Sequence, residues 1–148
     1  MRVLHIFSSV ILFSFFAYMG CDSGSDDPSI TETERVKTLL IGDAAIGTTW
    51  NIQSVTVGEV DYTDEFSGLS LTFSDGGVTA ENGRAVFEST DSWSFNDESA
   101  TSFTTGLGLN VTIQGITQNS LVLRFVLDET ILGRQDAVAG ENIFTFTR

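Results

Sequence analysis

From Thr48 onward the chain alternates hydrophobic and polar residues with a period of two, the pattern of strands that bury one face. Between Leu121 and Asp128, for example, every second residue is Leu or Phe. Glycine, asparagine and aspartate separate the runs and favour tight turns. The pattern predicts eight or nine strands, two of them short, at residues 48–57, 68–74, 77–80, 85–88, 92–96, 101–107, 109–117, 120–128 and 143–148.

The fold class follows from how these strands cover their apolar faces. Short connections favour antiparallel strands in up-and-down order. Each apolar face must be covered, which requires a closed barrel or two stacked sheets. Eight strands in this order close into a barrel whose interior holds side chains or one small ligand. We therefore predict an all-β fold with an antiparallel up-and-down eight-stranded barrel; a β-sandwich is the alternative.

A short helix is predicted before the strands, at residues 31–41. Two overlapping capping boxes, at 29–32 and 31–34, fit its start, and Gly42 fits its end. Apolar residues at helical spacing give it one apolar side, formed by Val36, Leu39 and Leu40. We expect this side to pack on, or to close, whatever the strands build.

The first 20 residues have the layout of a secretory signal: one basic residue, Arg2, an apolar run at 6–16 and no acidic residue. The apolar run is shorter than the roughly 20 residues that span a membrane as a helix. Gly20 and then Cys21 follow, and Cys21 is the only cysteine of the chain. A polar stretch rich in Asp, Ser and Gly comes directly after it.

The sequence AYMGC at 17–21 resembles the lipobox of bacterial lipoproteins. The resemblance implies that Cys21 becomes the first residue of the mature chain, is lipidated, and anchors the protein to a membrane of the cell envelope, with the outer membrane favoured. Several acyl chains, at about 0.8 kcal/mol per buried CH₂, give a stable anchor. Residues 21–30 then form a flexible tether and residues 31–148 the folded domain. The alternative is an ordinary secretory signal that leaves a free cysteine.

Charge and composition exclude several classes of function. The chain has 20 Asp and Glu against seven Lys and Arg, a net charge of −13. Such a surface repels phosphate, which excludes a nucleic-acid partner. One Cys and one His cannot supply an internal disulfide or a metal site built of several such ligands. Removal of residues 1–20 also removes His5 and leaves six basic against 20 acidic residues, a net charge of −14.

A second resemblance concerns the strands. The sequence GTTW at 47–50, after the predicted helix, is similar to the Gly-x-x-Trp opening of lipocalin-like domains in bacterial envelope lipoproteins. Further matches are LTFSDG at 71–76, ITQNSLVL at 116–123, and DSWSF at 91–95, where Asp91 replaces the small residue usual before the second Trp. The resemblance covers about residues 39–148 and implies a barrel with Trp50 at its closed end. It identifies no ligand, because lipocalin folds carry many functions.

Aromatic residues on the predicted strands are the candidate ligand contacts. The candidates are Trp50, Phe73, Trp93, Phe95 and Phe125. The alternative is that they form the core, since a barrel of this size can be filled by its own side chains.

Arg124 would meet an acidic head group if it faced inward, but the alternation of its neighbours favours the outer surface.

The acidic residues Asp61, Asp64 and Glu65 are close in sequence, so they are candidates for a pair of glycosidase carboxylates or for a calcium site. Residues 96–98 are a second candidate for a calcium site. Neither cluster has the spacing of a known calcium loop, and acidic loops are the expectation for so acidic a chain. We predict no catalytic residue, no metal and no cofactor.

Together these features predict a lipid-anchored envelope protein with a non-catalytic lipocalin-like module that binds a small apolar or amphipathic ligand. The alternative is a structural or interaction subunit, or an inhibitor, whose barrel is filled. The sequence identifies no protein partner.

Overall fold

The computed structural model describes residues 30–43, 45–128 and 139–148. The predicted signal at 1–20, the lipidation residue Cys21 and all of the tether but Ile30 lie outside the described residues. No helix within the described ranges combines the length and the apolar character that crossing a membrane requires.

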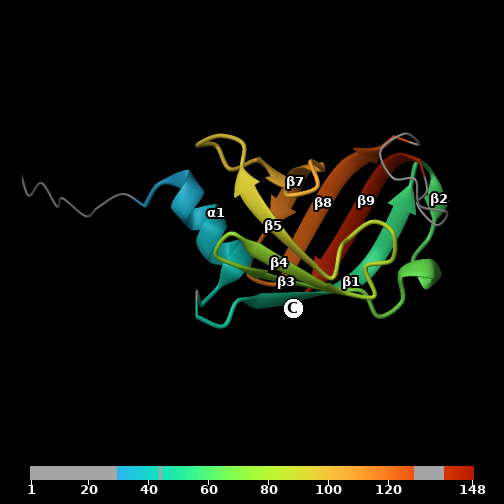
Figure 1. Cartoon of the computed structure of the whole chain (residues 1–148), viewed down its shortest axis with the longest axis horizontal. Helices are drawn as coiled ribbons and strands as arrows, with labels where there is room; N and C mark the ends of the chain where they lie inside the picture. Colours follow the sequence, from blue (N-terminus) through green and yellow to red (C-terminus); the bar gives the residue numbers. More distant parts are fainter. Residues whose placement is uncertain (1–29, 44, 129–138) are drawn as a thin grey trace, which may run out of the picture.

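The described part of the chain forms one helix followed by strands (Figure 1). In chain order the elements are α1 (Glu32–Ile41), β1 (Thr48–Val57), β2 (Val60–Asp61), the 3₁₀ helix η1 (Asp64–Phe66), β3 (Ser70–Ser74), β4 (Gly77–Glu81), β5 (Thr90–Phe95), β6 (Ser102–Thr105), β7 (Asn110–Ile116), β8 (Ser120–Leu127) and β9 (Gly140–Thr147). The strands follow the predicted order closely, with two differences: the two-residue β2, which pairs with β1, is additional, and the predicted strand at 85–88 is absent.

Antiparallel pairing closes the sheet on itself. β1 pairs with β3 through its first half, and each later strand pairs with the next as far as β9. The second half of β1 then pairs with β9, with Val55 opposite Phe144. The eight strands β1 and β3 to β9 therefore form a closed up-and-down barrel. The predicted barrel with a short N-terminal helix is confirmed, and the β-sandwich alternative is wrong.

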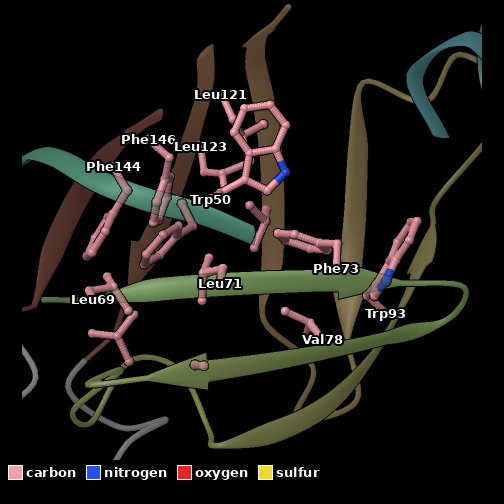
Figure 2. Packing of buried hydrophobic residues seen from close by; sticks show 14 of the residues in the cluster. Trp50, Leu69, Leu71, Phe73, Val78, Trp93, Leu121, Leu123, Phe144 and Phe146 are labelled. Atoms are coloured by element: carbon pink, nitrogen blue, oxygen red, sulfur yellow. The ribbon is translucent and has the colours of Figure 1, made fainter. Parts of the chain in front are cut away.

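The inward faces of the strands form one hydrophobic core (Figure 2). Alternate residues point inward because successive side chains of a strand lie on opposite faces. The largest residues with under 2 % exposure are Trp50, Phe73, Phe103, Phe144, Phe146, Leu40, Leu69, Leu71, Leu121, Leu123, Val55 and Val111.

Helix α1 closes the end of the barrel at which β1 begins, here called the helix end. Thr31 caps it: the Glu34 backbone N–H donates to Thr31 Oγ1 at 3.2 Å, and the Glu34 carboxylate accepts from the Thr31 N–H at 3.0 Å. That hydrogen bond lowers the pKa of Glu34. The predicted capping box at 31–34 is therefore confirmed, and the buried Leu40 and Ile41 join the core.

One predicted strand is wrong. Residues 85–88 belong to the connection between β4 and β5, here called the β4–β5 loop (82–89). Both Val86 and Phe87 donate their backbone N–H groups to the Gly83 carbonyl, which makes a tight turn instead of a ladder. Asn82 and Arg84, just before this segment, have positive φ values of 54° and 52°, which excludes an extended chain at these two positions.

Candidate functional site

A cavity of about 190 Å³ opens at the end of the barrel away from α1, here called the far end. The described residues that line it come from β4, the β4–β5 loop, β5, the end of β6, the turn between β6 and β7, and the end of β8. Seven are apolar: Val78, Ala80, Val86, Phe87, Leu107, Leu109 and Leu127. Three are polar: Glu88, Asp91 and Thr105. Its walls are therefore mostly apolar, with the polar groups in a minority.

The β4–β5 loop forms one wall of this cavity, and contacts within the protein fix its position. The Phe87 ring packs edge-on against Phe144, with centroids 5.4 Å apart, and against Phe125 at 5.8 Å. Asn82 Nδ2 donates to the Gly68 carbonyl at 2.9 Å. Arg84 forms an ion pair with Glu65 at 3.2 Å. The loop is thus attached both to the core and to the segment that contains η1.

Asp91 reaches the cavity because it lies on the inward face of β5. It pairs with the buried Val78 of β4, and paired residues in a sheet share a face. Trp93, two positions later, also points inward and is 6 % exposed. The half-buried Asp91 therefore places a carboxyl group beside apolar walls.

Of the five predicted ligand residues, four lie in the buried core and the fifth, the partly buried Phe95, packs against it; none of the five lines this cavity. Trp50 is fully buried, and its Nε1 donates to the Leu40 carbonyl of α1 at 3.0 Å. The Trp50 position at the closed helix end, which the resemblance implied, is confirmed. Phe125 is 3 % exposed, and its ring packs against Phe87, which lines the cavity.

The other three predicted residues pack together toward the helix end. The rings of Phe73 and Trp93 meet edge-on at 5.9 Å, and those of Trp93 and Phe95 at 5.1 Å. The indole N–H of Trp93 is satisfied by the carbonyls of Ser74 and Gly77, each at 3.0 Å. These aromatic side chains fill space between strands, so this part of the barrel interior is solid.

Arg124 faces outward, as the alternation predicted. Its side chain is 41 % exposed and forms an ion pair with Glu141 of β9. Because Arg124 pairs with Ile143 across the strands, Glu141 lies diagonally beside it on the outer face. Arg124 therefore holds no ligand inside the barrel.

The acidic cluster Asp61, Asp64 and Glu65 lies exposed in the segment of β2 and η1. Hydrogen bonding with the Thr63 side chain, and with the Thr63 N–H at 2.8 Å, lowers the pKa of Asp61. Glu65 is engaged by Arg84. Within the described ranges no group of three or more His, Cys, Asp or Glu side chains is placed to hold a metal ion.

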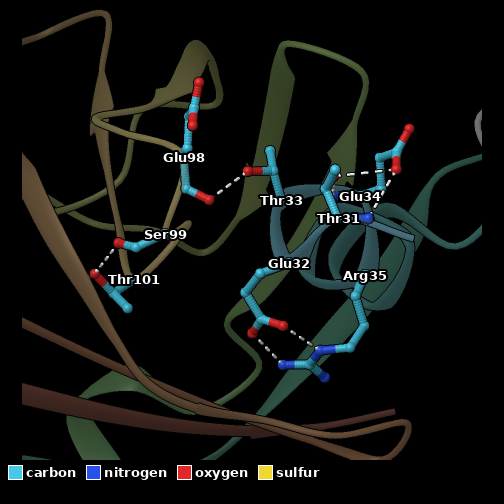
Figure 3. A network of polar contacts seen from close by, with 8 residues as sticks. All are labelled: Thr31, Glu32, Thr33, Glu34, Arg35, Glu98, Ser99 and Thr101. Carbon is cyan, nitrogen blue, oxygen red and sulfur yellow. Dashed lines mark hydrogen bonds and ion pairs between the residues drawn. The ribbon is translucent and has the colours of Figure 1, made fainter. Parts of the chain in front are cut away.

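The acidic residues at 97–98 help to hold α1 in place. The Thr33 hydroxyl donates to the Glu98 carbonyl at 2.6 Å, which joins α1 to the connection between β5 and β6 (Figure 3). In that connection Asp97 accepts a hydrogen bond from the Ser99 N–H at 2.9 Å, and its hydrogen bonds with Ser99 lower the pKa of Asp97. The observed role of this segment is structural.

The residues that line the cavity were missed by sequence reasoning, although one signal was present. The alternation that places Trp93 and Phe95 on the inner face also places Asp91 there. Val86 and Phe87 were assigned to a strand, and no local pattern marks them as a cavity wall. The chain matches no family model, no curated protein and no solved structure.

Proposed function

We propose that the protein is a lipid-anchored protein of the bacterial cell envelope, with the outer membrane favoured. Its lipocalin-like barrel acts as a non-catalytic module that binds a small apolar or amphipathic molecule. The cavity at the far end carries the binding part of this proposal. Seven of its ten described lining residues are apolar, and small-molecule sites are typically apolar with a few placed polar groups.

The chemistry of the lining supports binding rather than catalysis. The described residues around the cavity include no Ser, Cys, His, Lys or Tyr, the side chains that most often act as nucleophile or proton carrier beside carboxylates. The single His and the single Cys of the chain are His5 and Cys21, which belong to the predicted signal and its boundary.

The anchor is tested by metabolic labelling with a tagged palmitate. We expect label on the wild-type protein and none on Cys21→Ala, because the lipobox-like segment offers one thiol. Ser23→Ala, two residues away, is the matched control and should keep the label. An unlabelled wild-type protein, or label retained on Cys21→Ala, would contradict lipidation at this residue.

A second function is favoured by the packing at the helix end. The large aromatic side chains there leave that part of the barrel filled, as in a structural or interaction subunit, or an inhibitor, that carries no small molecule. In that case the barrel would serve as a rigid body whose outer surface meets a partner protein.

Native mass spectrometry of the protein, purified from its own membrane and freed of its acyl chains, separates the two functions. The binding module is expected to show a co-purifying mass that disappears on denaturation, because a ligand held in the cavity leaves when the barrel opens. A clean mass of the protein alone, with a protein partner recovered in the same purification, would favour the second function.

A further inference from the structure

The charged residues that line the cavity at the far end point to the chemistry of its ligand. Among the described lining residues, Glu88 and Asp91 are acids and none is Lys or Arg. Asp91 is the better placed of the two because the register of β5 fixes it on the inner face of the barrel.

Asp91 has no cationic partner within the described ranges. Its carboxylate accepts one hydrogen bond there, from the Ser92 N–H to Oδ1 at 2.7 Å. A carboxylate has room for more donors than this, since its two oxygens offer about four acceptor sites. The half-buried Asp91 carboxylate therefore has acceptor sites left for hydrogen bonds from a ligand.

The described cations are all engaged away from the cavity. Four of them form ion pairs with acids on the outer surface: Arg35 with Glu32, Lys37 with Asp75, Arg84 with Glu65 and Arg124 with Glu141. The fifth, Arg148, lies over the Trp50 ring at the helix end, 4.9 Å from the ring centroid. None of these five therefore neutralises Asp91.

The neighbouring turn leaves room for the carboxylate in this position. Gly106 follows β6, and its backbone N–H donates to the Ser92 carbonyl at 2.9 Å. A side chain at position 106 would put its Cβ 2.4 Å from Asp91 Oδ1 and 2.6 Å from the Ser92 hydroxyl. Glycine at this position lets the carboxylate lie between the turn and the cavity.

The size of the cavity limits the apolar part of the ligand. A closed apolar cavity of about 150 Å³ holds a benzene molecule. The cavity at the far end, at about 190 Å³, therefore suits one ring or a short alkyl chain with a small head group.

On this geometry, and resting on the proposed binding function, we infer that the ligand is a small amphipathic cation. Its apolar body packs against the walls formed by Val78, Val86, Leu109 and Leu127, and its ammonium or amidinium group donates hydrogen bonds to the Asp91 carboxylate. A carboxylate-bearing ligand such as a fatty acid is disfavoured, because it would bring a like charge beside Asp91.

The test compares three probes of one size on the purified full-length protein: benzylammonium, benzyl alcohol and benzoate. Calorimetric titration should rank benzylammonium at least about tenfold tighter than benzyl alcohol, with benzoate weakest, because a charge-assisted hydrogen bond is stronger than a neutral one. Asp91→Asn should remove that advantage and leave the affinity for benzyl alcohol unchanged. Glu59→Gln, which removes an exposed charge at the turn between β1 and β2, should leave the ranking intact.

The outcomes test the positive charge of the ligand separately from the proposed binding function. Equal affinity for the three probes, or a preference for benzylammonium that survives Asp91→Asn, overturns the cationic ligand and leaves the binding function standing. Tighter binding of benzoate overturns it as well. Binding of none of the probes overturns both this inference and the proposed binding function.

Discussion

Replacement of Trp50 by alanine is expected to lower the free energy of unfolding by about 3–5 kcal/mol, the range for removing a large aromatic side chain from a core. Trp50 is fully buried, and its indole N–H donates to the last turn of α1 through the Leu40 carbonyl at 3.0 Å. The Arg148 guanidinium lies over the ring, 4.9 Å from its centroid. The substitution therefore opens a cavity and detaches the helix from the barrel. Urea denaturation followed by circular dichroism measures the change.

Two further variants separate the contributions at this position. Trp50→Phe keeps most of the apolar volume but leaves the Leu40 carbonyl without its donor, which should cost about 1–3 kcal/mol. Ile46→Ala removes a residue that is 79 % exposed in the connection between α1 and β1, so it should change stability by less than about 0.5 kcal/mol. A loss for Trp50→Ala no larger than that for Ile46→Ala would contradict the role of Trp50 in closing the helix end.

Gly83→Ala is expected to displace the β4–β5 loop and to weaken ligand binding as well as stability. An added Cβ would lie 2.3 Å from the Phe87 carbonyl oxygen and 2.8 Å from Phe87 Cβ, so the loop must move. Overpacking of this kind costs about 1–3 kcal/mol. Because Val86 and Phe87 line the cavity, the affinity for benzyl alcohol should fall with the stability. Denaturation and calorimetric titration of the same samples measure both.

Gly115→Ala is the matched control for this substitution. Gly115 lies in β7, and an added Cβ there meets nothing within 4 Å. Its stability and its affinity for benzyl alcohol should therefore stay close to those of the wild type. Equal stability and equal affinity of the two variants would contradict the close packing of Gly83 against Phe87 in the β4–β5 loop.

The barrel could be predicted from the sequence because the patterns that specify its strands and turns each lie within a short stretch of the chain. Each run with a period of two has one face to bury, and short turns leave few ways to arrange eight such strands. The Thr31 capping box and the position of Trp50 at the helix end followed from short motifs in the same way. β2 escaped prediction because it is two residues long, with both residues exposed and no alternation to mark it.

The cavity could not be predicted because it depends on contacts between distant segments. The turn at Gly83 is fixed by Phe87 packing on Phe144, about 60 residues away in the chain. Alternation showed that Trp93 and Phe73 point inward, but not that their rings meet and exclude a ligand. An inward side chain fills the barrel or borders the cavity according to its height along the barrel axis relative to its neighbours. The alternation of hydrophobic and polar residues gives the direction of a side chain but not this height.

The most direct test of the binding site maps a neutral probe by NMR. Benzyl alcohol is titrated into protein labelled at the methyl groups of Leu, Val and Ile. We expect shifts for Val78, Val86, Leu109 and Leu127 around the cavity, and none for Val36, Leu40 and Ile41 at the helix end. Shifts confined to the helix end or to outward residues such as Val122 and Val126, or the absence of shifts at saturating probe, would contradict a binding site at the far end.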